Sequence, residues 1–219
     1  MIGTRVRGTM MCFKTGKFIT FEGIDGCGKS TQLLYFKEYL NKQGEDVITT
    51  REPGGTNVGD AIRSILLDRK YSDMTMEAEA LLYAASRVQH VTQVILPNAS
   101  AGKVVLCDRF IDSSIAYQGG GDPLTSQDVR NINSLTLDKI RPDITFLIDI
   151  DPEQAFKRLN RGRDRIENRG LQYQEKVRKN YLKIASKEPD RIIIIDGNRS
   201  KDEVFWDICD QFKRASEVD

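Results

Sequence analysis

A glycine-rich stretch near the N-terminus carries the residue types that bind phosphate groups. FEGIDGCGKSTQ, at positions 21–32, places Gly23, Gly28, Lys29 and Ser30 in the spacing G-x-x-x-x-G-K-[ST] of a phosphate-binding loop. Glycines adopt backbone angles closed to other residues, so successive N–H groups can turn toward phosphate oxygens. Lys29 is then placed to reach the β- and γ-phosphates, and the Ser30 hydroxyl to bind a bridging Mg²⁺. The sequence therefore predicts a nucleoside triphosphate held by Gly23, Ile24, Asp25, Gly26, Cys27, Gly28, Lys29, Ser30 and Thr31.

A second motif indicates which group accepts the transferred phosphate. A GTPase would carry an N-K-x-D motif, but the Asn41-Lys42 pair lacks the aspartate. A motor or transporter ATPase usually has an acidic residue after the aspartate of its second motif, whereas Arg109 follows Asp108 here. An arginine at the carboxyl end of a parallel strand points into the ligand crevice, where it can bind another phosphate. The sequence therefore favours a phosphate group over water as the acceptor.

These side chains must be positioned by strands and helices, and the sequence alternates between the two. Short β-branched runs at 17–22, 46–50, 103–107, 144–150 and 191–195 predict buried strands. Helical patterns occupy 30–43, 58–67, 76–96 and 201–213, and another helix starts at Pro152. The long helix over 76–96 is expected to end before Pro97. Strands separated by helices predict an α/β fold whose parallel sheet is covered on both faces.

The overall composition predicts one globular domain over residues 17–215 of the 219. Lys plus Arg number 33 and Asp plus Glu 32, so no overall field favours nucleic acid or an anionic membrane as a partner. The four cysteines form no CxxC pair, which is typical of free thiols in the cytosol, and no stretch reaches the roughly 20 apolar residues of a membrane helix. Residues 1–16 are basic and are predicted to be a disordered tail. An import signal is the alternative, and Met10 and Met11 are alternative starts.

Five blocks of the sequence resemble the thymidylate kinases among the P-loop nucleoside monophosphate kinases. They are FEGIDGCGKSTQ, REPGGT (51–56), EALLYAASRVQH (79–90), DRFIDSSIAYQG (108–119) and RGRDRIE (161–167), within a similarity that runs from 17 to 212. The resemblance implies a three-layer P-loop NTPase fold with five parallel strands, and transfer of the ATP γ-phosphoryl group to dTMP to give dTDP and ADP. It also implies a homodimer paired through helices 58–67 and 76–96. A kinase for another acceptor, such as dUMP or a deoxynucleoside, and a non-catalytic ATP-binding protein are the alternatives.

The base of the acceptor is expected to meet one face of the helix over 76–96. Tyr83 and Arg87 lie four residues apart and so share a face, where a ring could stack on a pyrimidine and a guanidinium could donate to its carbonyl oxygen. A core tyrosine and a surface arginine are the alternative. The resemblance favours base binding, although the family usually has phenylalanine at the position of Tyr83. It also implies base contacts from Ser114 and Gln118, with Ser113 as a further candidate.

The other acceptor contacts are likewise implied by the resemblance. Tyr117 resembles the ring beneath the deoxyribose, and Asp25 resembles a carboxylate near the sugar and phosphate that also helps to hold Mg²⁺. The REPGGT loop, with Arg51 and Glu52, is similar to a loop that closes over the acceptor phosphate, and an ordinary Pro-Gly turn is the alternative. Arg63, on the next helix, is either a phosphate contact or a surface charge.

An arginine-rich segment over 158–169 is the candidate lid. Gly26 stands where some family members, notably eukaryotic ones, carry an arginine directed at the transferred phosphate. Arg161, or Arg163 beside it, is therefore expected to supply that charge, as in the bacterial branch, and Lys29, Asp25 and Arg109 complete the predicted catalytic set. A solvated basic loop or a weak RNA patch is the alternative. The arginines of the segment are Arg158, Arg161, Arg163, Arg165 and Arg169.

Overall fold

The computed structural model describes residues 16–159 and 164–216, and within these ranges five strands form one parallel sheet. The strands are β1 (Phe18–Glu22), β2 (Val47–Arg51), β3 (Val104–Asp108), β4 (Ile144–Asp149) and β5 (Ile192–Asp196), in the order β2-β3-β1-β4-β5. The predicted α/β fold with a five-stranded parallel sheet is confirmed, and the strand limits agree with the predicted ones to within a residue or so. Apart from Gly16, the predicted disordered tail over 1–16 lies outside the described ranges, and it stays a prediction, as do the domain bounds 17–215.

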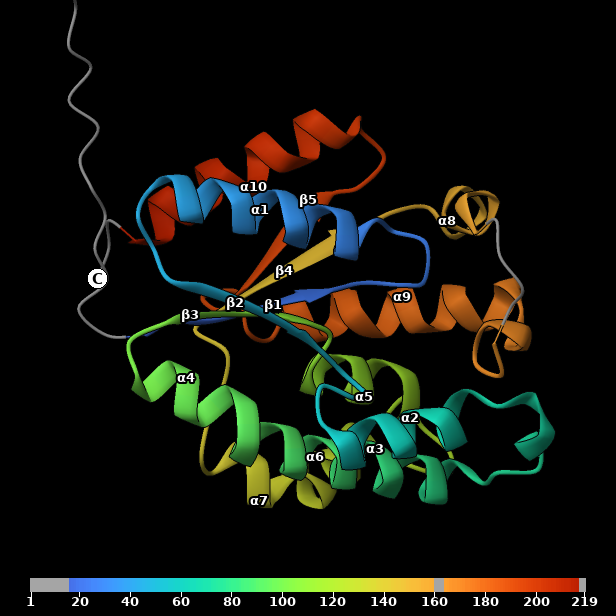
Figure 1. Ribbon diagram of the computed structural model, residues 1–219. Coiled ribbons are helices and arrows are strands. Elements are labelled where there is room, and N and C mark those ends of the chain that lie inside the picture. The colour runs from blue at the N-terminus through green and yellow to red at the C-terminus, as the bar shows by residue number, and fades with distance from the viewer. Residues whose placement is uncertain (1–15, 160–163, 217–219) are drawn as a thin grey trace, which may run out of the picture.

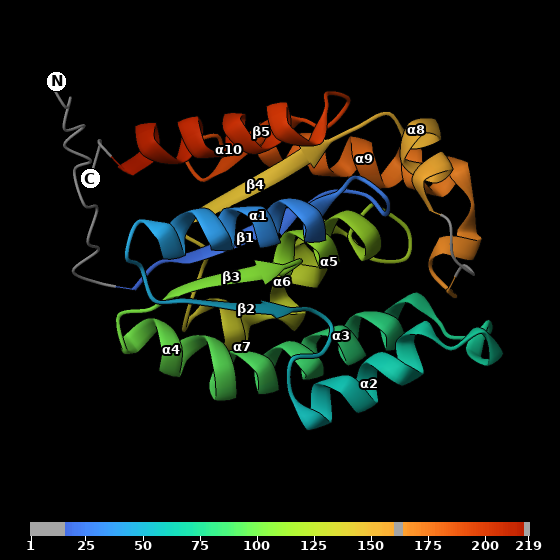
Figure 2. The ribbon, with the colours of Figure 1, turned by 45° about the horizontal axis from the view of Figure 1, so that its top comes forward.

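Helices cover both faces of this sheet (Figure 1). α1 (Lys29–Lys42) and α10 (Lys201–Ser216) pack together on one face, and α9 (Leu171–Ala185), α5 (Ile111–Gln118) and α4 (Leu96–Ser100) lie on the other. Figure 2 shows α2 (Asn57–Leu67) and α3 (Met76–His90) side by side beyond the β2 edge. The remaining helices are α6 (Ser126–Ile132), α7 (Ser134–Leu137) and α8 (Pro152–Arg158), with the short helical turns η1 (Arg69–Tyr71), η2 (Val91–Ile95) and η3 (Glu167–Arg169). No helix in the described ranges is long and apolar enough to cross a membrane.

The central strands are buried because helices cover them on both sides. Every residue of β1 is buried, as are Val104 to Cys107 of β3. Phe21 of β1 packs against Phe36 of α1 and Phe146 of β4, with ring centroids 6.0 and 5.5 Å apart. Continuous apolar strands of this kind are the pattern of a parallel sheet enclosed between helices, and this core fixes the strand ends that carry the site.

The long helix departs from the sequence prediction at Pro97. The prediction that it ends before this residue is wrong, because α3 passes through the π-helical turn η2 into α4. In that turn the Leu96 N–H donates to the Val91 carbonyl oxygen, five residues back. Pro97, which has no N–H, then falls in the first turn of α4, directly after this π-helical turn.

Three strands end side by side at the edge where the chemistry is expected. β1 ends at Glu22, β2 at Arg51 and β3 at Asp108, and the register places Asp108 beside both Phe21 and Arg51. From β1 the chain first builds the β2 side of the sheet and later crosses to β4 on the other side. Ligands of open α/β sheets bind outside the carboxyl ends of the strands at such a reversal.

Candidate functional site

The phosphate-binding loop joins β1 to α1 and requires its glycines. Gly23, Gly26 and Gly28 have φ angles of 139°, 82° and 99°, in the region that side chains disfavour. A Cβ at Gly23 would lie 2.5 Å from the Ile148 carbonyl oxygen, and one at Gly26 would lie 2.3 Å from that of Ala155. An arginine at position 26 would therefore clash with the backbone. The loop ends at the N-terminus of α1, whose positive dipole end favours an anion.

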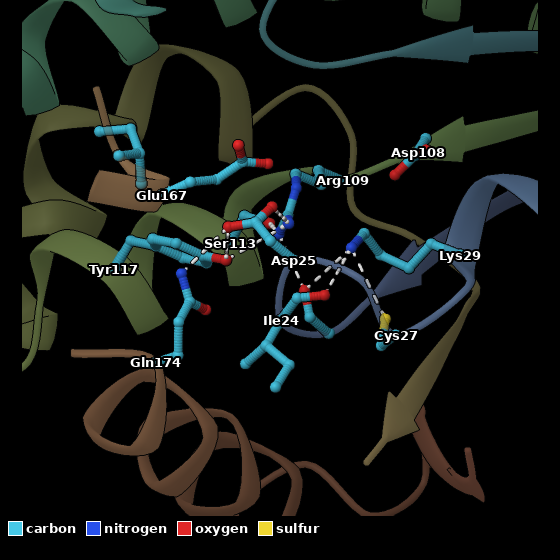
Figure 3. A network of polar contacts seen from close by, with 12 residues as sticks. Ile24, Asp25, Cys27, Lys29, Asp108, Arg109, Ser113, Tyr117, Glu167 and Gln174 are labelled. Carbon is cyan, nitrogen blue, oxygen red and sulfur yellow. Dashed lines mark hydrogen bonds and ion pairs between the residues drawn. The ribbon is translucent and has the colours of Figure 1, made fainter. Parts of the chain in front are cut away.

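Lys29 is held inside this loop (Figure 3). Its ammonium donates to the carbonyl oxygens of Gly23, at 3.2 Å, and Ile24, at 2.9 Å, and lies 3.6 Å from the Cys27 sulfur. The loop and Lys29 line a cavity of about 910 Å³, and Ser30, Thr31 and Asp108 also line it. All predicted triphosphate-binding residues except Gly23 and Ile24 line this cavity, and Gly23 and Ile24 instead hold Lys29.

Ser30 and Asp108 form an oxygen pair at the floor of the cavity. The Ser30 hydroxyl donates to Asp108 Oδ2 at 2.5 Å. A hydroxyl and a carboxylate are the oxygen donors that Mg²⁺ takes from P-loop proteins, and Mg²⁺ completes its shell with phosphate oxygens and water. Among the described residues no group of three or more His, Cys, Asp or Glu side chains could hold a metal, so phosphate oxygens would have to complete this shell. Asp108 is absent from the predicted metal ligands, although its place before Arg109 could have indicated it.

Arg109 lies between the phosphate loop and the acceptor side of the site. Its φ of 71° is unusual for a residue other than glycine, and such strain is often found at functional sites. The guanidinium donates to Asp25 Oδ1 at 2.6 Å and to the Gly23 carbonyl oxygen at 2.9 Å (Figure 3). It also contacts the hydroxyls of Ser113 and Tyr117. Arg109 therefore connects the loop with the start of α5.

Asp25 is ionised in this arrangement. Burial works against its charge, but Arg109 and Lys29 outweigh burial and lower the pKa of the carboxyl group. Its second oxygen accepts from the Tyr117 hydroxyl at 3.0 Å and from Gln174 Nε2 at 3.1 Å. The predicted role of Asp25 at the metal and acceptor stays a prediction, since in this structure its oxygens bind these protein groups.

A second cavity, the acceptor cavity, adjoins the first and is lined by the residues predicted to contact the acceptor. All of them line it: Asp25, Glu52, Arg63, Tyr83, Arg87, Arg109, Ser113, Ser114, Tyr117 and Gln118. The two cavities share Asp25, Glu52, Arg63 and Arg109. Residues from α2, α3, α5 and the loop after β2 therefore meet at one place, although their contacts with a substrate stay predictions.

Arg87 is a buried residue of this cavity wall. The alternative of a surface arginine is wrong, because Arg87 is 1% exposed. Its guanidinium donates to Glu52 Oε2 at 2.7 Å, to Asn133 Oδ1 at 2.6 Å and to the Ser114 hydroxyl at 2.9 Å. These partners fix the guanidinium plane, and Asn133 carried no signal in the sequence.

Glu22 and Tyr181 lie next to Arg109, although the sequence predicted no role for either residue. Burial, and then Asp112, raises the pKa of Glu22 to about 7. Its carboxyl group accepts from the N–H of Phe110 at 2.7 Å and from the hydroxyls of Ser113 and Tyr181 at 2.6 and 2.8 Å. Glu22 thus orients the start of α5, and its position at the end of a buried strand could have indicated this.

The described part of the arginine-rich segment lies against the acceptor cavity. Asp164 and Ile166 line that cavity, and the Arg165 N–H donates to the Leu67 carbonyl oxygen of α2. Arg165 and Arg169 both bind Glu79 of α3, while Arg158 donates to the Gly197 carbonyl oxygen. Arg161 and Arg163 lie outside the described residues, so their predicted catalytic role stays a prediction.

Fold and site together define a P-loop nucleoside monophosphate kinase, in which a triphosphate loop and an acceptor cavity share one wall. The family model for thymidylate kinase matches residues 21–208. The chain belongs to the thymidylate kinase family.

Similar proteins span nearly the whole chain. A thymidylate kinase of Thermoanaerobacter sp. (strain X514) is 47% identical over 200 residues, which cover 91% of this chain and 98% of that protein. One from Geobacillus sp. (strain WCH70) is 45% identical over 194 residues, covering 87% and 92%. The crystal structure of thymidylate kinase from Ehrlichia chaffeensis aligns with a TM-score of 0.72 at 35% identity and covers 91% of this chain and 99% of that one. These similarities and the site agree on a phosphotransferase that uses ATP.

Proposed function

We propose that the protein transfers the γ-phosphoryl group of ATP to dTMP, giving dTDP and ADP. The observation that carries this proposal is the wall shared by the two cavities, where Asp25, Glu52, Arg63 and Arg109 face both. A donor phosphate in the loop and an acceptor phosphate in the second cavity would meet there. Holding both reactants in line is the main contribution a protein makes to phosphoryl transfer.

The charges of the shared wall favour an anionic acceptor. Burial, and then the neighbouring Arg51, lowers the pKa of Arg63, so several guanidinium groups crowd the same region. Asp25 pairs with Arg109, whereas the hydrogen bond that Arg63 donates within the described part of the chain goes to the Pro53 carbonyl oxygen. A phosphate monoester would relieve the repulsion between the guanidinium groups, and Arg63 is our candidate for that contact.

The inner end of the cavity favours a pyrimidine with a carbonyl group beside a ring N–H. Glu52 and Ser114 hold the guanidinium of Arg87 in place, and a further N–H of this group would donate to the base. Gln118 supplies an amide oxygen that is buried and has no hydrogen-bond partner among the described residues. The 4-oxo group and the N3–H of thymine would satisfy this pair of donor and acceptor. We expect Tyr83 to stack on the base and Tyr117 to lie beneath the deoxyribose, since both line this cavity.

Mg²⁺ belongs to the same proposal. Ser30 and Asp108 would hold it, with Asp25 as the further candidate. When bound, Mg²⁺ neutralises charge that develops on the β- and γ-phosphate oxygens. Lys29 would bind the same oxygens from inside the loop, and Arg109 would orient the acceptor phosphate toward them.

A homodimer through α2 and α3 is also proposed. These helices pack against each other and expose Val58, Ile65 and Leu81 by 52%, 39% and 57%. Apolar side chains gathered on neighbouring helices are typical of an interface. A cytosolic location is proposed as well, because Cys27, Cys107 and Cys209 are buried free thiols, which suit a reducing compartment.

A coupled assay of ADP release tests the reaction. The purified protein is given ATP and Mg²⁺ with dTMP, dUMP, dCMP, dAMP or no acceptor, and we expect the highest kcat/KM with dTMP. A preference for another monophosphate would refute the proposed substrate. ATP binding without ADP release for any acceptor would favour the non-catalytic alternative.

A further inference from the structure

Glu79 of α3 is a buried carboxylate that lies behind the acceptor cavity rather than on its wall. It is 0% exposed and is not among the residues that line the cavity. Its Oε1 accepts from Gln118 Nε2 at 2.8 Å, whereas its Oε2 accepts from Arg165 at 2.5 Å and from Arg169 at 2.6 Å. A buried carboxylate is costly unless it is paired, and here the pairing uses both oxygens.

The ion pairs determine what Glu79 can offer to Gln118. Two guanidinium groups pair with one oxygen of Glu79, and a carboxylate in such ion pairs only accepts hydrogen bonds. The NH₂ group of Gln118 must therefore face Glu79, because the amide oxygen would be repelled.

The orientation of the amide decides what the cavity presents to a ligand. The oxygen and nitrogen of an amide lie on opposite sides of the group, so Gln118 Oε1 is turned away from Glu79. Gln118 is 3% exposed and lines the cavity, and its Oε1 has no hydrogen-bond partner within the described part of the chain. A buried acceptor without a partner favours a ligand that brings an N–H group.

We propose that Glu79 is a positioning residue for base selection, which holds Gln118 in the orientation that accepts a hydrogen bond from the base. The inference rests on the proposed function, since it assumes that the base enters this cavity. Thymine and uracil carry an N–H at ring position 3 and a carbonyl group at position 4, which match Gln118 Oε1 and the donors of Arg87. Cytosine carries a lone pair at position 3 and an amino group at position 4, so both contacts would be repulsive. Glu79 thus excludes cytosine without touching it.

The test compares kcat/KM for dTMP and dCMP in the parent enzyme and in Glu79→Gln. A glutamine at position 79 can donate or accept, so Gln118 is free to turn over. We expect the dTMP preference over dCMP to fall by at least about tenfold, because a mispaired polar contact accounts for large discrimination factors. Loss of the contacts to Arg165 and Arg169 lowers the rate with both nucleotides and cancels in the ratio. Where dCMP turnover is below detection, its inhibition constant against dTMP replaces kcat/KM.

Two further variants show whether Glu79 acts through Gln118. Glu77→Gln, an exposed change on the same helix, is the matched control and should leave the ratio unchanged. Gln118→Ala should lower the ratio, and adding Glu79→Gln to it should lower the ratio no further, because both changes remove one contact.

The results with these variants either support or overturn the proposed role of Glu79. A Glu79→Gln ratio within twofold of the parent, or effects of the two substitutions that multiply, would overturn the inference. If Glu79→Gln does not fold, Gln118→Ala tests the inference instead, since an unchanged ratio of kcat/KM for dTMP over dCMP in that variant would also overturn it. A parent enzyme inactive toward every pyrimidine monophosphate would overturn the proposed function itself, whereas an active parent with an unchanged Glu79→Gln ratio overturns this inference alone.

Discussion

Replacing Arg87 by methionine should damage both stability and acceptor binding, for separate reasons. The side chains of Arg87 and Glu52 are 1% and 2% exposed, and their atoms Nε and Oε2 are 2.7 Å apart. Arg87→Met keeps much of the side-chain volume but leaves the buried Glu52 carboxylate with His90, 3.1 Å away, as its remaining side-chain partner among the described residues. Removing one member of a buried ion pair costs about 3–5 kcal/mol. In a domain of this size that corresponds to a fall in Tm of roughly 6–20 °C.

The second effect is on the acceptor. Arg87 is the proposed donor to the base carbonyl, and a hydrogen bond from a charged group contributes about 1.5–3 kcal/mol. KM for dTMP should therefore rise roughly 10- to 150-fold, with a smaller change in KM for ATP. Urea unfolding, thermal melting and steady-state kinetics of the same preparations measure both effects.

The double variant Arg87→Met/Glu52→Gln separates stability from binding. It removes the stranded charge, so it should recover much of the stability of the parent while KM for dTMP stays high. Arg130→Met is the matched control, because the Arg130–Glu188 pair is equally short at 2.6 Å but 32% and 28% exposed, and exposed pairs contribute at most about 1 kcal/mol. The reasoning is refuted if Arg87→Met costs no more than Arg130→Met, or if the double variant is no more stable than Arg87→Met.

Four further outcomes are expected. Lys29→Ala should abolish most phosphoryl transfer in a protein with an unchanged circular dichroism spectrum. Near-normal turnover in this variant would refute the proposal that the loop binds the transferred phosphate. Tyr117→Ala should narrow the preference for dTMP over its ribonucleotide, because a ring beneath the sugar would leave no room for a 2′-hydroxyl. Equal losses of activity with both nucleotides would make Tyr117 a packing residue. Glu22 binds its proton more tightly in the folded protein, where its pKa is about 7, than unfolded, where it is 4.5, so the parent should lose about 3 kcal/mol of stability as pH rises through this interval. The Glu22→Gln variant should not lose stability in this way. Equal slopes of unfolding free energy against pH in the parent and in Glu22→Gln, between pH 5 and pH 8, would contradict this prediction. Arg161→Ala should lower kcat at least about a hundredfold with little change in dTMP affinity, whereas turnover within a few fold of the parent in Arg161→Ala, Arg163→Ala and the double variant would leave the segment a basic loop.

The phosphate loop and the sheet could be predicted because their signals are local. The loop needs particular residue types within a few positions, and Gly23 and Gly26 have the positive φ angles that the motif implies. The strands are short β-branched runs, and burial on both faces makes them continuous in the sequence. Pro97 was misjudged because a π-helical turn makes room for it, and no residue type announces such a turn.

The family resemblance predicted the residues that line the second cavity, but not the residues that hold them. Arg87 is bound by Asn133, which is 46 positions away along the chain, and Glu79 is bound by Arg165, which is 86 positions away. A single sequence marks such residues only as a polar position in an apolar pattern, as at Glu79, or not at all, as at Asn133. Their charges become meaningful when the fold removes water from around them.

By itself, the sequence determined the chemistry of the donor side, because a phosphate loop is made by neighbouring residues whose backbone angles and charges depend little on the rest of the chain. It also determined the sheet, since strands that are buried between helices appear in the sequence as continuous apolar runs. Only the tertiary structure decided that Arg87 is a buried guanidinium held by Glu52, that Asp108 pairs with Ser30, and that Glu79 faces Gln118 on one side and Arg165 and Arg169 on the other. The physical reason is that hydrogen bonds and ion pairs depend on distance and on the exclusion of water. Both arise when the ends of β1, β2 and β3 and the faces of α3 and α5 are brought together.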